Sequence, residues 1–281
     1  MNALAPTRPS PFAVVAAALA TAALLAASPS GAQDVKAPVV DPALMNEAGE
    51  IAYSREVDRA RARRALDTNT QQLASARRMS TLLIAYAATM APVAASWTWA
   101  IHVETREEPV AYCLPGGKIM LSTGLVDRAK LTPPELAVVL AHVIGHALAG
   151  DDAARAMARL ATIRESPDPN RRILQLAEIL GKIVVGEPHD KETEREMDSL
   201  TLELMARAGV DPEPAAEAWR KIARQGGASP PGFLALHPTW PGRIDAIEAQ
   251  IPTILPLYEQ ARAEQAARPR LPPVRTRPGL N

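Results

Sequence analysis

The sequence predicts a mostly α-helical α+β domain in which a small antiparallel β-sheet is attached to packed helices. Hydrophobic residues make up 47% of the 281 residues and aromatic residues only 4%, a composition that favours packed helices over a β-sandwich. Helix caps and helical periodicity recur along most of the chain, whereas only three short runs have the character of strands. These observations define the fold class.

The N-terminus has the features of a targeting segment. Arg8 gives a weakly positive start, residues 12–27 are rich in Ala, Leu and Val, and residues 30–32 are small, as a cleavage site requires. The apolar stretch is short for a membrane span. We expect residues 1–32 to be the signal peptide of a periplasmic or otherwise exported protein, with no stable membrane span after cleavage. Without cleavage, the segment would leave the protein membrane-associated.

The remaining chain divides by composition. We expect a linker over 33–46, an N-terminal helical region over 47–94, a main domain over 95–267 and a disordered, Pro- and Arg-rich tail over 268–281. Lys plus Arg equals Asp plus Glu at 31 each. The chain therefore has no net positive charge that would attract nucleic acid, and we expect no nucleic-acid partner.

Three short runs over 97–103, 110–114 and 118–122 predict the strands of the sheet. Pro115-Gly116-Gly117 predicts a tight turn between the second and third strands. Cys113 lies in the second run, has no disulfide partner, and is expected to be a buried, inert thiol.

Helices follow the predicted strands. Thr132 and Glu135 form a capping box with prolines between them, so a helix is expected over 136–149, ending at Gly150. Further helices are expected near 152–164, 170–185, 191–208 and 212–224. A last helical stretch covers 243–267, and Pro252 and Pro256 are expected to interrupt it.

His142 and His146 stand four residues apart in the capped helix, so both rings lie on one helix face. That geometry suits two ligands of a tetrahedral zinc ion. Two ordinary, partly buried histidines are the alternative, but the surrounding run VVLAHVIGHALAG is apolar, where an unpartnered imidazole pair is costly.

A third ligand is available from the charged start of the helix over 191–208. Spacing alone leaves Glu192, Glu194 and Glu196 in competition. Asp198 lies one turn beyond Glu194, so one of these two carboxylates can bind metal while the other orients a ligand histidine.

The chain resembles the exported zinc metallopeptidases related to the CAAX prenyl protease, HtpX, BepA and LoiP. The resemblance covers residues 97–258 and rests on the segments AYCLPGGKIMLSTGLVD, ELAVVLAHVIGHAL, ETEREMD, ARAGVDPEPAAEAWRKI and LHPTWPGRI. It implies a zincin-like metallopeptidase domain with one Zn²⁺ per chain. It also implies His142, His146 and Glu194 as ligands, with Asp198 behind them.

The same resemblance implies roles for two residues of the last segment and for one strand. His237 would lie close to the metal as a self-inhibiting fourth ligand, and Arg243 would shape the site. His237 as a plain turn histidine before proline is the alternative. Extended or unfolded polypeptide would pair with an edge strand made of Lys118, Ile119, Met120, Leu121 and Ser122.

The chain departs from the family at the position that does proton chemistry. The family motif is His-Glu-x-x-His, and Val143 stands where the Glu belongs. That Glu takes a proton from the attacking water and passes it to the leaving amine, and losing such a base costs about 10²–10⁴ in rate. Val110 and Thr201 replace the usual Asn and Gly.

Three hypotheses follow. The chain is a zinc endopeptidase of periplasmic protein quality control that hydrolyses unfolded proteins, or it is a catalytically impaired relative that binds zinc and extended polypeptide as a chaperone or adaptor. The third is a metal-free structural protein. Val143 favours the second.

Overall fold

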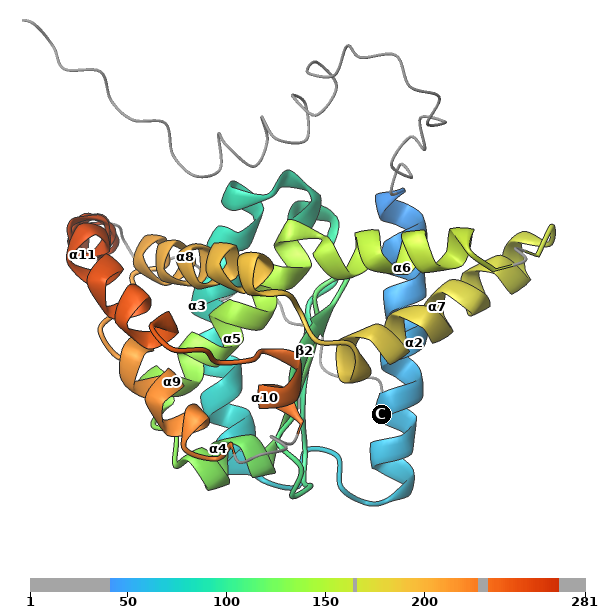
Figure 1. Cartoon of the computed structure of the whole chain (residues 1–281), viewed down its shortest axis with the longest axis horizontal. Coiled ribbons are helices and arrows are strands. Elements are labelled where there is room, and N and C mark those ends of the chain that lie inside the picture. The colour runs from blue at the N-terminus through green and yellow to red at the C-terminus, as the bar shows by residue number, and fades with distance from the viewer. Residues whose placement is uncertain (1–40, 164–165, 227–231, 268–281) are drawn as a thin grey trace, which may run out of the picture. The chain divides into compact units, whose positions relative to one another are not determined.

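The computed structural model describes residues 41–163, 166–226 and 232–267. The predicted signal peptide, the linker up to residue 40 and the predicted tail lie outside the described residues. The described part is mostly helical with one small sheet, which confirms the predicted fold class (Figure 1). The strands are β1 (Ala100–Glu104), β2 (Ala111–Leu114) and β3 (Lys118–Ser122).

The helices follow the predicted order. They are α2 (Pro42–Ala62), α3 (Thr70–Met90), a 3₁₀ turn η1 (Pro92–Ser96), α4 (Thr123–Ala129), α5 (Pro133–Ala149), α6 (Asp151–Ala161), α7 (Pro169–Gly186), α8 (Lys191–Arg207), α9 (Ala215–Ala223), α10 (Phe233–Leu236) and α11 (Arg243–Ala267). The short helices α4 and α10 were not predicted.

Helix α5 is the centre of the helical layer. It packs against α3, α8 and α9 and against strand β2, and every residue from Glu135 to Leu148 is buried. The predicted capping box is present, because the Glu135 carboxylate accepts the Thr132 N–H at 2.7 Å. At the other end, Gly150 adopts φ +73° and stops the helix. The caps therefore set where each turn of α5 lies.

A second group of helices covers the sheet from the other side. Helix α2 packs along α7 and also contacts β2 and β3, so the sheet lies between α5 and the α2–α7 pair (Figure 1). The core between them holds Met45, Tyr53, Tyr112, Met120 and Leu180. Tyr53 also donates its hydroxyl proton to the Ile119 carbonyl at 2.7 Å, which ties α2 to the central strand.

The sheet differs from the predicted antiparallel arrangement. Its strand order is β1-β3-β2, with β3 in the middle; β2 pairs with β3 antiparallel, but β1 pairs with β3 in parallel. The hairpin at residues 115–117 fixes only the β2–β3 pair. Strand β1 lies on the other side of β3 from β2, and the connection over 105–110 joins β1 to β2. The alternation of residues within a strand does not predict which strand it pairs with, so the sequence did not predict this order.

Two boundaries also differ from prediction. The Asp41 side chain accepts the Ala43 N–H at 2.9 Å and Pro42 opens α2, so residues 42–46 belong to a helix rather than to a linker. The region over 47–94 is two helices, α2 and α3, separated by a turn in which Arg64 and Asp67 have positive φ.

Helix α11 runs through both Pro252 and Pro256 without the predicted interruption. Each proline removes one backbone hydrogen bond. Packing of α11 against α8 and α9 supports the helix across both positions.

Candidate metal centre

His142 and His146 project from one face of α5, as their spacing predicts. Their rings meet edge to face with centroids 4.8 Å apart, and their Nε2 atoms are 3.2 Å apart. Both side chains are buried. Two buried imidazole nitrogens at this distance need a proton or a cation between them, because their lone pairs otherwise repel.

Glu194 is the acidic residue of α8 that reaches this histidine pair. Its Oε1 lies 3.4 Å from His146 Nε2 and its Oε2 lies 3.4 Å from His142 Nε2. Glu192 and Glu196, which spacing left in competition, are exposed. The Asp190 side chain caps α8 through the N–H groups of Glu192 and Thr193, and the packing of α8 on α5 turns Glu194 inward.

His237 completes the cluster from the segment after α10. Its Nδ1 lies 3.1 Å from His142 Nε2 and 2.8 Å from Glu194 Oε1. His142, His146, Glu194 and His237 are all buried, and each offers one donor atom within 4.8 Å of the others. This position does not suit a plain turn histidine.

The donor set fits a tetrahedral zinc ion. Zinc bonds to nitrogen and oxygen of about 2.0–2.1 Å separate the donor atoms of a tetrahedron by about 3.3–3.4 Å, and the closest donor pairs here lie 2.8–3.4 Å apart. Three imidazoles and one carboxylate are also ligands that zinc prefers. Glu194 Oε1 faces both His146 and His237, whereas Oε2 makes no well-aligned hydrogen bond within the described residues and lies 2.5 Å from Arg243 Nη2.

Protonation states in the cluster follow from burial and charge. Burial lowers the pKa of His142 and lowers that of His237 to about 4, so both rings keep a free lone pair. Burial opposes charge on His146 and Glu194 as well. However, Asp151 and Glu194 raise the pKa of His146 to about 10, and the surrounding imidazoles hold the pKa of Glu194 well below its usual range. Binding a cation therefore requires His146 to release a proton.

Asp198 and Arg243 lie directly behind Glu194. Arg243 is buried, and its Nη2 lies 2.5 Å from Glu194 Oε2, while its Nη1 donates to the Pro238 carbonyl at 2.8 Å. Asp198 Oδ1 lies 3.8 Å from His142 Nδ1, too far for a hydrogen bond. The Thr201 hydroxyl oxygen is closer to that nitrogen, at 3.4 Å.

Val143 is buried in α5 next to the ligand pair, with 1% of its surface exposed. An isopropyl group accepts no proton. Glu194 is the one carboxylate among the four clustered residues, and its oxygens already face the three histidines and Arg243. The described cluster therefore holds no carboxylate that is free to act as a base.

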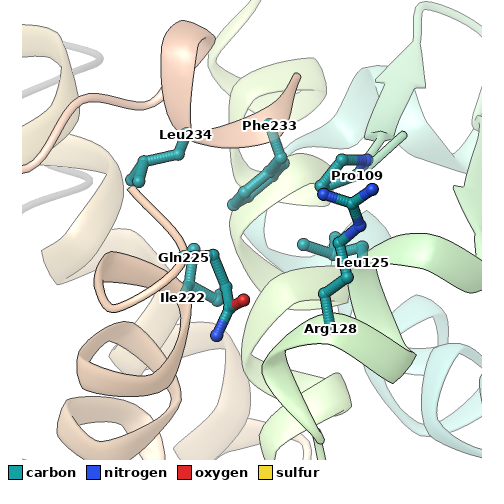
Figure 2. A pocket seen from close by; sticks show the side chains of 7 residues that line it. All are labelled: Pro109, Leu125, Arg128, Ile222, Gln225, Phe233 and Leu234. Carbon is teal, nitrogen blue, oxygen red and sulfur yellow. The ribbon is translucent and has the colours of Figure 1, made fainter. Parts of the chain in front are cut away.

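The segment that carries His237 also closes the space beside the cluster. The Phe233 ring lies 4.5 Å from that of His237 and 5.9 Å from that of Trp219, measured between centroids. A cavity next to it is lined by Pro109, Leu125, Arg128, Ile222, Gln225, Phe233 and Leu234, and Figure 2 shows these side chains around it. Its volume of about 10 Å³ is about that of one water probe, so a substrate side chain does not fit.

The predicted edge strand is wrong. Lys118, Ile119, Met120, Leu121 and Ser122 form β3, which has β1 on one side and β2 on the other. Both of its edges are already paired, so no further strand can add to it. An open edge is a property of strand order, which the sequence did not disclose.

Two residues next to the cluster were not predicted. Asp151 Oδ2 lies 2.7 Å from His146 Nδ1, and the His189 ring lies 4.0 Å from the His146 ring between centroids. His189 precedes α8 in a loop, where no periodicity marks it. Asp151 follows Gly150 directly, and a carboxylate five residues after a candidate ligand histidine was the available signal.

Cys113 is buried as expected, and burial raises the pKa of its thiol.

No single described helix is long and apolar enough to cross a membrane. Helices α5 and α6 taken together, with a bend of 47° between them, have sufficient length and apolar composition.

Comparison with known proteins gives consistent matches. The family model of peptidase family M48 matches residues 75–251. The mitochondrial metalloendopeptidase OMA1 of Arabidopsis thaliana is 32% identical over 158 residues, which is 55% of this chain and 32% of the relative. OMA1 of Saccharomyces cerevisiae is 26% identical over 58% of this chain and 50% of its own length, and human OMA1 is 24% identical over 61% and 36%. The chain thus spans between a third and a half of the length of these relatives.

Proposed function

This chain belongs to peptidase family M48, and from that premise we propose that it is a zinc-binding member with impaired hydrolysis that holds extended polypeptide as a chaperone or adaptor. The observation that carries the proposal is the contrast within α5. His142 and His146 converge with Glu194 and His237 on one point, while Val143 occupies the position of the base.

Zinc is the cation that this donor set favours. His142, His146 and Glu194 would hold it, with His237 as a fourth ligand. A bound zinc ion supplies a Lewis acid that polarises a carbonyl group. Four protein ligands without an open position are typical of zinc sites that hold structure rather than turn over substrate.

The absence of a base at position 143 sets the expected size of the defect. A positioned general base contributes about 10²–10⁴ in rate, which corresponds to about 3–5.5 kcal/mol of activation free energy. Glu194 cannot replace it, because its two oxygens already face the cluster and Arg243. Hydrolysis therefore falls while zinc binding persists.

An active zinc endopeptidase is the second candidate. It is favoured by the ligand set, since His142, His146 and Glu194 lie together as the family resemblance implies. In that case His237 would have to leave the cluster to admit substrate, and the proton transfer would need a group from outside it.

Polypeptide would bind at the outer edge of β2 rather than at β3. Ser122 donates its backbone N–H to the Val110 carbonyl, and Val110 donates its N–H to the Ser122 hydroxyl oxygen. Backbone groups alternate in direction along an antiparallel strand, so those of Ala111 and Cys113 point away from β3. Phe233 donates its N–H to the Pro109 carbonyl at 2.7 Å on the same edge. We infer that α10 must move before an extended chain can pair there.

The setting of this function is also a proposal. Residues 1–32 have the composition of a signal peptide, which supports an exported, periplasmic protein that meets unfolded proteins. An uncleaved segment would keep the same domain at the membrane surface.

The test uses zinc-loaded wild type, His142→Ala as the metal-site control, and a reduced, carboxymethylated protein as unfolded substrate. Binding is followed by fluorescence anisotropy and cleavage by gel electrophoresis. The proposal expects binding without cleavage. Cleavage that chelation abolishes and zinc restores would establish the endopeptidase instead, and a wild type that holds no zinc would exclude both.

A further inference from the structure

We propose that Asp151 is a positioning residue of the metal centre, which fixes the His146 ring so that its Nε2 faces the cluster. The inference rests on the proposed zinc site. It concerns a residue that the ligand set does not include. Asp151 lies on the outer side of His146, away from the other three donors, and its carboxylate oxygen Oδ2 is 2.7 Å from His146 Nδ1.

The local sequence explains why Asp151 reaches back to His146. Gly150 adopts φ +73°, a conformation that costs glycine little. The chain bends by 47° between α5 and α6 at this point. Asp151 is the first residue of α6, so its side chain returns toward the last turn of α5 instead of continuing along it.

Asp151 is itself held in place. Its Oδ1 accepts the Asp152 N–H at 2.9 Å, and the start of a helix favours a negative charge. Its Oδ2 also lies 3.2 Å from His189 Nδ1. The side chain is only 19% exposed, so water competes little for either oxygen.

His189 restrains the same ring from its face. The two imidazole planes are 30° apart with centroids at 4.0 Å. The backbone N–H of His189 donates to the backbone carbonyl of Leu236 at 2.9 Å, and Leu236 directly precedes His237. The position of the His146 ring is therefore coupled to the segment that carries the fourth donor.

The chemical consequence follows from the two ring nitrogens. When the neutral ring donates a hydrogen bond from Nδ1–H to a carboxylate, its lone pair lies on Nε2 and that nitrogen becomes a stronger metal ligand. A hydrogen bond from Nδ1 to Asp151 thus keeps the proton on Nδ1, so the proton that His146 releases when the ion binds is the one on Nε2.

A second cation between His146, Asp151 and His189 is the competing explanation for this group. Arg155 argues against it. Its Nη1 lies 3.3 Å from His189 Nδ1 and 3.1 Å from Asp152 Oδ1, so a guanidinium already supplies the positive charge there. A metal ion bound to His189 would lie next to this guanidinium, and the two positive charges would repel each other.

The experiment measures zinc affinity by competition with a chromophoric chelator for wild type, Asp151→Ala, Asp151→Asn and Asp152→Asn. Asp152 is the matched control, because it neighbours Asp151 but its carboxylate faces Arg155 and not His146. We expect Asp151→Ala to lose about 10–100-fold in zinc affinity, Asp151→Asn to lose less, and Asp152→Asn to stay near wild type. Thermal unfolding of each zinc-loaded variant checks that it is folded.

Proton NMR of the zinc-loaded protein supplies a readout that a general loss of stability would not move. Wild type and Asp152→Asn should show a downfield, slowly exchanging His146 Nδ1–H resonance, and Asp151→Ala should lack it. Equal zinc affinity in wild type and Asp151→Ala would overturn the proposal while leaving the zinc site intact. A wild type that binds no zinc would overturn both.

Discussion

Arg243 and Asp198 form a buried, two-pronged ion pair at the base of the metal centre. Arg243 Nε donates to Asp198 Oδ2 at 2.8 Å and Nη2 donates to Oδ1 at 2.7 Å. The guanidinium also lies 3.9 Å from the centroid of the Trp219 ring. This pair joins the start of α11 to α8, the helix that carries Glu194.

Replacing Arg243 should therefore destabilise the fold as well as the site. Arg243→Ala leaves the Asp198 carboxylate buried without its two-pronged partner, which costs about 3–5 kcal/mol. Arg243→Lys should also be destabilising, because an ammonium group cannot make the two parallel bonds. Urea unfolding of the three proteins measures this, and a lysine variant as stable as wild type would show that the two-pronged geometry is unimportant.

Zinc should bind with a stoichiometry of one per chain and stabilise the folded state. A ligand present at 100 times its dissociation constant adds about 2.7 kcal/mol, so removing zinc with a chelator should lower Tm and adding zinc should restore it. His142→Ala and Glu194→Gln should lose this response. Atomic absorption and calorimetry provide the two measurements, and a Tm that ignores zinc would count against the site.

His237→Ala should keep zinc, because His142, His146 and Glu194 remain. Its affinity should fall less than that of His142→Ala, and a water molecule should gain access to the opened side of the cluster. Cobalt-substituted protein tests this, since its visible spectrum changes when an imidazole ligand is replaced. An unchanged spectrum would mean that His237 is not a ligand.

Asp67 should stabilise the turn between α2 and α3. Its carboxylate accepts the Val103 N–H at 2.9 Å and lies 2.7 Å from His102 Nδ1. Burial disfavours the charge of Asp67, but these bonds outweigh it and lower its pKa. Asp67→Asn, which also tolerates the positive φ at this position, should cost about 1–2 kcal/mol at pH 7.

The sign of the pH dependence is fixed by the lowered pKa. The stabilisation by Asp67 is present above its ordinary value of 3.8 and is lost as the pH falls through the lower, folded-state value. The gap in unfolding free energy between wild type and Asp67→Asn should therefore close in acid. A gap that persists unchanged at pH 2 would assign the effect to geometry rather than charge.

Local signals in the sequence predicted the parts of the fold that local interactions determine. The caps at Thr132 and Gly150 predicted the bounds of α5, and with them that His142 and His146 share one helix face. The strand order was not predictable, because the partner of β1 is chosen by packing between distant segments. For the same reason the approach of His189 to His146 had no counterpart in the sequence.

The role of Glu194 was only partly predictable from the sequence. Its spacing in α8 left three glutamates equivalent, and family resemblance selected one of them. In the structure, the orientation of α8 against α5 buries Glu194 and leaves Glu192 exposed. Helix-to-helix orientation depends on the whole packed interface, so residue spacing within α8 carries only part of it.

Hydrolysis by zinc-loaded Val143→Glu, with Val143→Gln as a control of nearly the same shape, tests the central claim most directly. The claim is that the centre holds zinc but lacks the group that would use it. The movement of α10 and His237 that admits polypeptide is common to wild type and variants, so it cancels in the comparison. We predict that Val143→Glu cleaves an unfolded protein with a kcat/KM about 10²–10⁴ times that of wild type, whereas Val143→Gln stays at the wild-type level. Wild type that cleaves as fast as Val143→Glu, or a folded and zinc-loaded Val143→Glu that cleaves no faster than wild type, would contradict it.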